Sequence, residues 1–318
     1  MTAPLASRPA DDLGLPVPVP PVVRRVVSLV PSLTESVAIT RPGLVAGATD
    51  WCTHPAALEA ERIGGTKNPD LARVAALRPD LVLANEEENR PGDLAALRDA
   101  GIPVWVTRIR SLPGALVSLG RMLTQGCRLD RPAWLDAAAA AWQDPAPPRE
   151  PVPAIVPIWR RPWMVLGSET FAGDLLARLG IRNVYAGHQE RYPRIALGEL
   201  QSAAAALVVL PDEPYPFSAD DGPESFGGLP AALVSGRHLT WYGPSLAEAP
   251  SLLRSQLAAA QAGAEAGGAP AGGGSRGGTS SEAGVWSPPR REAHRGSSRT
   301  VVRDGEDGCG PGDTAHQR

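Results

Sequence analysis

The clearest pattern in the chain is a short amphipathic stretch followed by an unbroken apolar run. In residues 71–77 (LARVAAL) the apolar side chains recur every three or four positions, which predicts a helix, and Asp70 precedes them as its N-cap. Pro79 is expected to end this helix. Residues 81–84 (LVLA) have no polar position, which predicts a parallel strand buried on both faces.

Polar side chains follow this strand directly. Asn85, Glu86, Glu87 and Glu88 come immediately after it. In open α/β sheets, ligands bind in the crevice beyond the carboxyl ends of the strands. The sequence therefore places a candidate binding site on these residues.

A weaker copy of the same unit lies later in the chain. Residues 197–213 (LGELQSAAAALVVLPDE) align with residues 71–87, and Asp212 and Glu213 follow the second strand as the glutamates follow the first. The repeat predicts two units of similar build, each with acidic residues at its strand ends.

A second internal similarity has the same order. Residues 27–34 (VSLVPSLT) and 164–170 (MVLGSET) each read as an apolar strand, a Pro or Gly, and Ser-x-Thr at a helix start. Strands alternate with helices through both regions, with a last strand predicted at 238–242, which is typical of parallel sheets covered by helices. We therefore predict an α/β fold of two lobes of similar build, with parallel sheets that face a shared cleft, and a helix at residues 131–143 that is long enough to run along one side of both lobes.

Composition divides the chain further. Residues 1–23 are Pro-rich and predicted to be unstructured. The lobes are expected at 24–111 and 151–261, with a helical linker at 112–150. Residues 262–318 are rich in Gly, Ser and Arg and poor in aliphatic side chains, which predicts disorder.

Charge and motifs exclude several classes of protein. A net charge of −3 gives no electrostatic case for nucleic acid. No run approaches the roughly 18 apolar residues of a membrane span, and the N-terminus lacks the pattern of a signal peptide, so the cytoplasm is the expected location. The chain has no GxGxxG after the first strand, no P-loop lysine motif, no GxSxG nucleophile elbow and no HExxH motif, and we expect no enzyme activity.

The candidate ligand-binding residues gather at predicted strand ends. Acidic walls on both sides would favour a cation or an uncharged ligand with hydrogen-bond donors, although charge runs are more often solvated loops. Aromatic rings offer stacking faces for a macrocycle, with core packing as the alternative, and arginines either bind ligand carboxylates and amides or lie on the surface. The candidates are Trp51, His54, Asn85, Glu86, Glu87, Trp159, Arg160, Trp163, Arg191, Tyr192, Asp212, Glu213 and Tyr215.

Cysteine and histidine form no complete metal site. Cys52, Cys127 and Cys309 lie far apart and make no disulfide framework. Cys52, His54 and His188 are weak candidates for a metal or the axial position of a corrinoid, since zinc needs about four ligands. We predict neither a resident metal nor a cofactor.

Several segments, in order, resemble the helical-backbone substrate-binding proteins. They include VVSLVPSLTE, DWCTHP, GTKNPDL, LRPDLVLANEEEN, ERYP, LPDEPYPF and LTWYGPSL, within about residues 24–261. This family comprises relatives of the periplasmic cobalamin- and siderophore-binding proteins of ABC importers. The resemblance implies two Rossmann-like lobes joined by a single rigid spanning helix, here residues 131–143, and a ligand, a corrinoid or another metal chelate, that is held between the lobes without bond chemistry. It also implies an ABC-transporter permease as partner; we expect a monomer.

The chain departs from this family in three ways. It shows no export signal, and Ala72 and Gly198 stand where docking members carry an acidic residue. Trp51 is where a stacking aromatic is expected, while Thr66 and Asn85 replace others. Two hypotheses follow: an importer receptor, extracytoplasmic if the start site is misassigned, or a cytosolic chelate-binding protein no longer coupled to a transporter.

Overall fold

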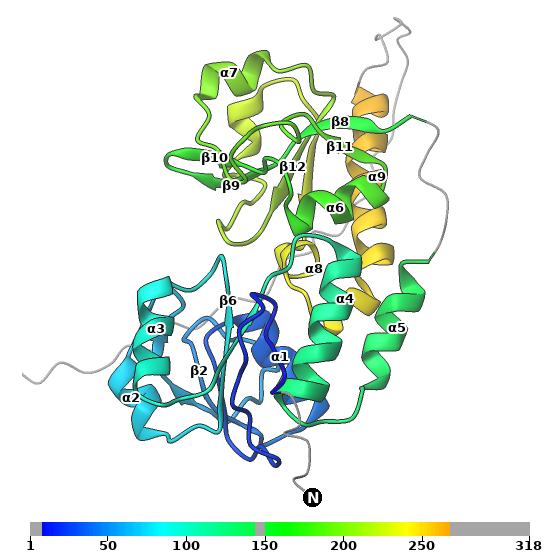
Figure 1. Cartoon of the computed structure of the whole chain (residues 1–318). Coiled ribbons are helices and arrows are strands. Elements are labelled where there is room, and N and C mark those ends of the chain that lie inside the picture. The colour runs from blue at the N-terminus through cyan, green and yellow to red at the C-terminus, as the bar shows by residue number, and fades with distance from the viewer. Residues whose placement is uncertain (1–7, 144–149, 268–318) are drawn as a thin grey trace, which may run out of the picture. The chain divides into compact units, whose positions relative to one another are not determined.

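The first lobe is built on a five-stranded sheet. The computed structural model describes residues 8–143 and 150–267 (Figure 1). The strand order is β3-β2-β1-β6-β7, and neighbouring strands are parallel. The elements of this lobe are β1 (Val26–Ser28), α1 (Pro31–Thr40), β2 (Val45–Ala48), β3 (Glu61–Arg62), the β4 (Gly64–Gly65) and β5 (Asn68–Pro69) hairpin, α2 (Leu71–Ala76), β6 (Leu81–Asn85), α3 (Pro91–Asp99) and β7 (Val104–Thr107).

The second lobe repeats this plan around four parallel strands in the order β11-β8-β12-β13. Its elements are β8 (Val152–Ile155), the antiparallel hairpin β9 (Pro157–Arg160) and β10 (Trp163–Val165), α6 (Phe171–Arg178), β11 (Ile181–Asn183), α7 (Leu197–Ser202), β12 (Leu207–Pro211), the 3₁₀ turn η2 (Pro223–Phe226), β13 (Ala231–Val234), α8 (Gly236–Thr240), the 3₁₀ turn η3 (Pro244–Ala247) and α9 (Ala249–Gly267). Two parallel sheets with helices confirm the predicted α/β fold class.

Helical segments connect the lobes. Helix α4 (Leu112–Arg121) continues as a π-helical turn, η1 (Met122–Gly126), and α5 (Ala133–Ala141) follows beside it (Figure 1). Trp134 Nε1 donates to Thr40 Oγ1 in α1 at 2.9 Å, and Trp142 Nε1 donates to Leu246 O in η3 at 2.9 Å. The two indoles thus fix opposite ends of α5, the middle of the predicted 131–143 helix, to segments of the two halves of the chain.

The first internal repeat corresponds to equivalent strands. β6 lies between β1 and β7, and β12 lies between β8 and β13. The side chain of Asp70 accepts a hydrogen bond from the Arg73 N–H at 2.9 Å and caps α2, as predicted. Arg78, which precedes Pro79, leaves the helical region with a φ of 46°. The helix therefore ends where the proline predicts.

The second internal similarity is wrong as a structural equivalence. Residues 27–28 lie in the central parallel strand β1, whereas residues 164–165 lie in β10 of an antiparallel hairpin. Thr170 is the N-cap of α6 and accepts from Gly173 N at 3.3 Å, but Thr34 lies inside α1 and donates to Val30 O. The same Ser-x-Thr pattern thus occupies different positions in the two helices.

The predicted last strand at 238–242 is also wrong. This segment begins as helix α8, because the Asp212 carboxylate accepts from Gly236 N at 2.6 Å at the first turn. The strand that completes the sheet is β13, which pairs in parallel with β12. The closing helix α9 runs to Gly267, beyond the predicted onset of disorder at 262, and the predicted tail 268–318 lies outside the described residues.

The N-terminal segment is ordered from residue 8 onward, contrary to the prediction for residues 1–23; residues 1–7 are outside the described part. Asp12 N donates to Val106 O at 3.1 Å, and Asp12 Oδ2 accepts from Arg108 N at 3.0 Å. The Asp11 side chain is buried and accepts from Leu13 N at 2.9 Å. These two aspartates join the segment to the edge strand β7, which Pro-rich composition alone does not reveal.

No helix within residues 8–143 and 150–267 has the length and apolar character needed to cross a bilayer.

Candidate functional site

The loop after β6 touches the second lobe. Glu87 Oε2 accepts a hydrogen bond from Tyr192 OH at 2.7 Å, and Glu87 Oε1 forms an ion pair with Arg191. The Arg191 guanidinium also donates to Glu169 O, at 3.0 Å from Nε and 2.7 Å from Nη2. Three of the predicted site residues, Glu87, Arg191 and Tyr192, therefore meet at the boundary between the lobes.

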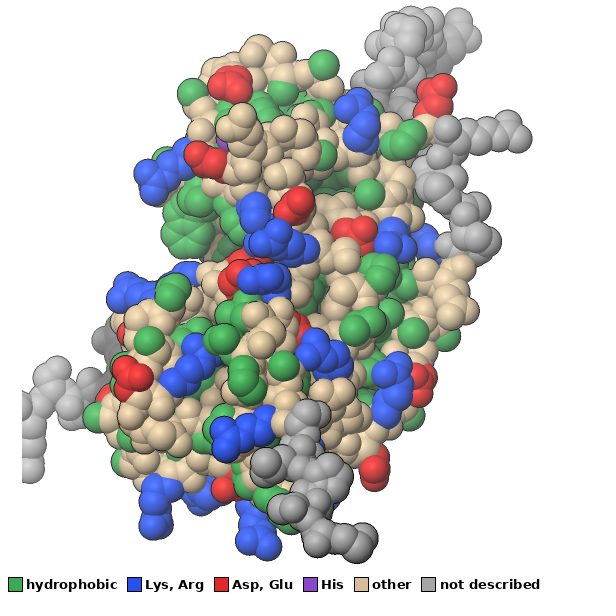
Figure 2. Space-filling view, in the orientation of Figure 1, with side chains coloured by type: hydrophobic (Ala, Val, Ile, Leu, Met, Phe, Trp, Pro, Cys, Tyr) green, Lys and Arg blue, Asp and Glu red, His purple; other side chains and the backbone are tan. Residues whose placement is uncertain are grey.

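Other acids at this boundary are also paired with arginine. Glu86 Oε2 lies 2.9 Å from Arg108 Nε, and Arg110 Nη1 reaches across the boundary to Glu169 Oε2 at 2.7 Å. Figure 2 shows acidic and basic side chains intermixed along this boundary. The prediction that acidic walls face each other is wrong for Glu86 and Glu87, because each of them has an arginine as its partner.

A more buried acidic group lies behind these pairs. Tyr242 OH is 3.4 Å from Glu88 Oε1. Burial raises the pKa of Glu88, and burial together with the Glu88 charge raises the pKa of Tyr242 well above its ordinary value. This contact again joins the loop after β6 to the second half of the chain.

The acids after β12 have local partners. Asp212 caps α8 by accepting from Gly236 N, while burial and the neighbouring Asp212 charge raise the pKa of Glu213 to about 7. The Arg237 charge opposes this shift. Arg237 itself forms an ion pair with Glu35 of α1, whose side chain is only 4% exposed. Sequence patterns did not predict Glu35 or Arg237, because their pairing depends on how α8 packs on α1.

The loop after β2 carries the most exposed large apolar side chain of the described residues. Trp51 is 67% exposed. His54 in the same loop packs edge-on against Trp241, with ring centroids 5.6 Å apart, and burial and the Arg237 charge lower its pKa. The Trp51 indole is thus exposed to solvent, in the loop whose His54 contacts a segment from the second half of the chain.

The two cysteines of the described region are not metal ligands in this arrangement. Cys52 is buried against the Thr34 and Thr49 hydroxyls at 3.1 and 3.2 Å, and burial raises its pKa. His188 Nδ1 accepts from Glu190 N at 2.9 Å. No group of three or more His, Cys, Asp or Glu side chains within residues 8–143 and 150–267 is arranged to hold a metal ion.

Aromatic candidates of the second lobe divide into exposed and packed rings. Trp159 is 41% exposed and packs edge-on against Tyr215, with centroids 5.6 Å apart. Tyr215 OH donates to Asp221 Oδ2 at 2.7 Å. Trp163 instead stacks on Phe217 and meets Phe226 edge-on, within the smaller apolar core. Trp159 thus has a free face, and Trp163 is a packing residue.

Two other candidates are engaged inside their own lobe. Arg160 forms ion pairs with Asp221 and Glu224. Asn85 is buried: its Nδ2 donates to Thr107 O at 3.2 Å, and its Oδ1 accepts from Glu87 N at 2.9 Å. Asn85 therefore shapes the loop that carries Glu87 and has no free amide for a ligand.

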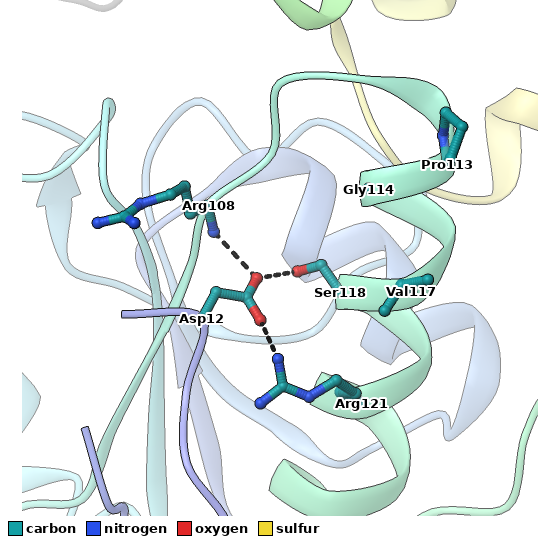
Figure 3. A pocket seen from close by; sticks show the side chains of 7 residues that line it. All are labelled: Asp12, Arg108, Pro113, Gly114, Val117, Ser118 and Arg121. Carbon is teal, nitrogen blue, oxygen red and sulfur yellow. Dashed lines mark hydrogen bonds and ion pairs between the residues drawn. The ribbon is translucent and has the colours of Figure 1, made fainter. Parts of the chain in front are cut away.

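A shallow cavity of ≈ 420 Å³ lies between the N-terminal segment and α4, and Arg108, the partner of Glu86, is among its lining residues. Figure 3 shows the Asp12 carboxylate at its centre, accepting from Arg121 Nη1 at 2.8 Å and from the Ser118 hydroxyl. Pro113 and Val117 add apolar lining. The carboxylate is fully paired with protein groups, so this cavity offers no free charge to a ligand.

The two-lobed fold is shared with solved structures of periplasmic binding proteins. The structure of the vitamin B12-binding protein BtuF of Vibrio cholerae matches with a TM-score of 0.59 and 16% identity, over 75% of this chain and 98% of that one. The periplasmic heme-binding protein BhuT, in complex with two hemes, matches with a TM-score of 0.63 and 23% identity, over 74% and 98%.

Sequence comparison also finds similar proteins. A vitamin B12-binding protein of Vibrio cholerae is 32% identical over 90 residues, 28% of this chain, so the chain spans about a third (33%) of that relative's length. A vitamin B12-binding protein of Pectobacterium atrosepticum is 23% identical over 204 residues, 59% of this chain and 72% of that protein. No model of a known protein family matches the chain. The resemblance predicted from the sequence is confirmed by these similarities.

Proposed function

We propose that the protein binds a corrinoid or another metal chelate between its lobes and acts as a substrate-binding protein of an ABC importer. Trp51 carries this proposal: its indole is 67% exposed in the loop after β2, whose His54 contacts Trp241. A free flat ring at such a boundary suits a macrocycle. The names of the similar proteins support a tetrapyrrole-like ligand, and binding rather than catalysis.

Trp159 supplies a second exposed ring, from the other lobe. Each exposed indole loses water-accessible apolar surface when a flat ligand stacks on it, which favours binding by roughly 25 cal/mol per Å² buried. Because the two rings belong to different lobes, a ligand that touches both would join the lobes without any bond chemistry.

Titration of the purified chain tests this proposal. Cobalamin, dicyanocobinamide, hemin and a ferric siderophore are added in turn, and absorbance and melting temperature are followed. We expect a saturable spectral shift and a higher melting temperature with at least one of the tetrapyrrole-like chelates. A shift with none of the four ligands would overturn the proposal.

Variants locate the site. Trp51→Ala should weaken binding about tenfold or more, the loss expected from about 1.4 kcal/mol of stacking and burial, while Trp51→Phe should keep most of the affinity. The matched control is Val117→Ala, because Val117 is 63% exposed but lies on α4 beside the shallow cavity. An effect of Val117→Ala without an effect of Trp51→Ala would place the ligand in that cavity instead.

A second candidate is a chelate-binding protein that does not dock on a transporter. Ala72 and Gly198 are both exposed at the second residue of α2 and α7, and neither supplies a carboxylate. A pull-down of the loaded protein with an ABC permease distinguishes the two candidates. The similar solved structures are described as periplasmic, so we favour an extracytoplasmic location over the cytoplasmic one expected from the N-terminal sequence.

A further inference from the structure

Three side chains form a polar clasp across the lobe boundary: Glu87 from the loop after β6, and Arg191 and Tyr192 from the second lobe. Arg191 and Tyr192 both bind the Glu87 carboxylate, one oxygen each. The Glu87 and Arg191 side chains are only 25% and 21% exposed. The clasp therefore joins the surfaces of the two lobes. In the proposed function the ligand enters between these surfaces.

A ligand that enters between these surfaces must separate Glu87 from Arg191. Both side chains then need new partners. A largely buried charge that has no partner bears the full cost of its removal from water. Arg191 can only donate hydrogen bonds, and an ionised Glu87 can only accept them. The rim of the ligand must therefore present an acceptor on one side and a donor on the other.

This requirement separates two classes of tetrapyrrole. The rim of a heme carries carboxylates, which satisfy an arginine but repel Glu87. The rim of a corrinoid carries primary amides, and each amide offers both a carbonyl acceptor and an N–H donor. Glu88, whose charge acts on Tyr192, adds repulsion against carboxylates when it is ionised, and Lys67, whose Nζ donates to Glu87 O, opposes that repulsion.

We infer that Glu87 and Arg191 exchange partners with the ligand rim and make the site select an amide-rimmed corrinoid over a carboxylate-rimmed porphyrin. This inference rests on the proposed function and specifies its ligand class. Tyr192 helps to position the Glu87 carboxylate through its 2.7 Å hydrogen bond.

Two opposite substitutions test the inference. The affinities of the full chain for dicyanocobinamide and hemin are measured by quenching of tryptophan fluorescence. We expect the wild-type chain to bind cobinamide at least tenfold more tightly than hemin. Glu87→Gln removes the negative charge but keeps the shape, and should narrow this ratio at least fivefold, mainly by improving hemin binding. Arg191→Gln removes the cation that a carboxylate needs, and should widen the ratio.

Arg178→Gln is the matched control, because Arg178 pairs with Asp174 inside α6 at 2.9 Å and does not reach the clasp. It should leave both affinities unchanged. A wild-type preference for hemin, or equal changes for both ligands in Glu87→Gln and Arg191→Gln, would overturn the inference while leaving the proposed function in place. Binding of neither ligand, nor of the other chelates titrated above, would overturn the proposed function itself.

Discussion

The loops after β6 and β12 occupy equivalent places in the two lobes, yet their acids have different partners. Glu87 reaches Arg191 and Tyr192 of the other lobe, whereas Asp212 accepts from Gly236 N within its own lobe. Strand position decides where the acids lie, and the segment that packs against each loop decides what they bind. An internal repeat thus predicts architecture without predicting contacts.

The path that follows the first central strand also differs between the lobes. β1 leads through Leu29 and Val30 directly into α1, whereas the β9–β10 hairpin is inserted between β8 and α6. Trp159 and Trp163 belong to this insertion. The first lobe offers its exposed ring, Trp51, from the loop after β2 instead. Each lobe therefore has an exposed tryptophan, but the elements that carry the two side chains are not equivalent.

If pairing across the lobes matters more than pairing within one, Arg237→Met should have the largest effect on stability. It leaves the Glu35 carboxylate, 4% exposed, without a cation. Loss of one partner of a buried ion pair costs about 3 kcal/mol or more. Urea unfolding should show a fall of this size in the free energy of unfolding.

The control for this substitution is Glu248→Gln. Glu248 is the outer partner of Arg237 at 3.5 Å and is 63% exposed, so its loss should cost less than about 1 kcal/mol. The double variant Glu35→Gln, Arg237→Met removes both charges and should recover part of the loss. An Arg237→Met protein as stable as Glu248→Gln would show that the Glu35–Arg237 pair stabilises the fold no more than the exposed Glu248–Arg237 pair does.

Glu213→Gln tests the loop after β12 through its pH dependence. The folded pKa of Glu213 is about 7, above the ordinary 4.5, because of burial first and the Asp212 charge second. Between these two values the folded chain holds a proton that the unfolded chain has lost. Glu213 therefore lowers stability progressively as pH rises from about 4.5 to 7, and the full cost remains above pH 7.

Glutamine carries no charge, so Glu213→Gln should gain stability relative to the wild type between pH 5 and pH 8, by on the order of 2 kcal/mol after allowance for screening by water. Chemical unfolding at the two pH values measures the difference. Part of the wild-type pH dependence should persist in the variant, since burial also raises the pKa of Glu88. A constant difference between variant and wild type would show that Glu213 does not titrate in this range.

The sequence predicts the parts of this fold that depend on local pattern. The apolar run of β6, the Asp70 cap and the stop at Pro79 are each encoded within a few residues, and each is confirmed. The α8 segment fails this test: its HLTWY pattern suits a strand, but the cap from Asp212, distant in sequence, starts a helix there.

The candidate site was less predictable for the same reason. The sequence located Glu87, Arg191 and Tyr192 separately, and the structure brings them together. Asn85 and Trp163 have the right residue types but are used by the loop and the core. The N-terminal segment reads as unstructured until the contacts of Asp11 and Asp12 with β7 are seen. Long-range partners decide each of these outcomes.

The smallest expected effect concerns the repeated helices themselves. In the internal alignment Ala72 of α2 corresponds to Gly198 of α7; both are exposed, and a Cβ built on Gly198 meets nothing within 4 Å. Gly198→Ala should therefore raise the free energy of unfolding by roughly 0.5 kcal/mol, since alanine favours the helix and restricts the unfolded chain. Ala72→Gly should lower it by a similar amount. The urea midpoints of the two variants and the wild type, measured together, check both predictions, provided that the dependence of the unfolding free energy on urea concentration is unchanged. A loss of stability in Gly198→Ala would mean that the two helices, like the loops after β6 and β12, are not interchangeable even where nothing touches them.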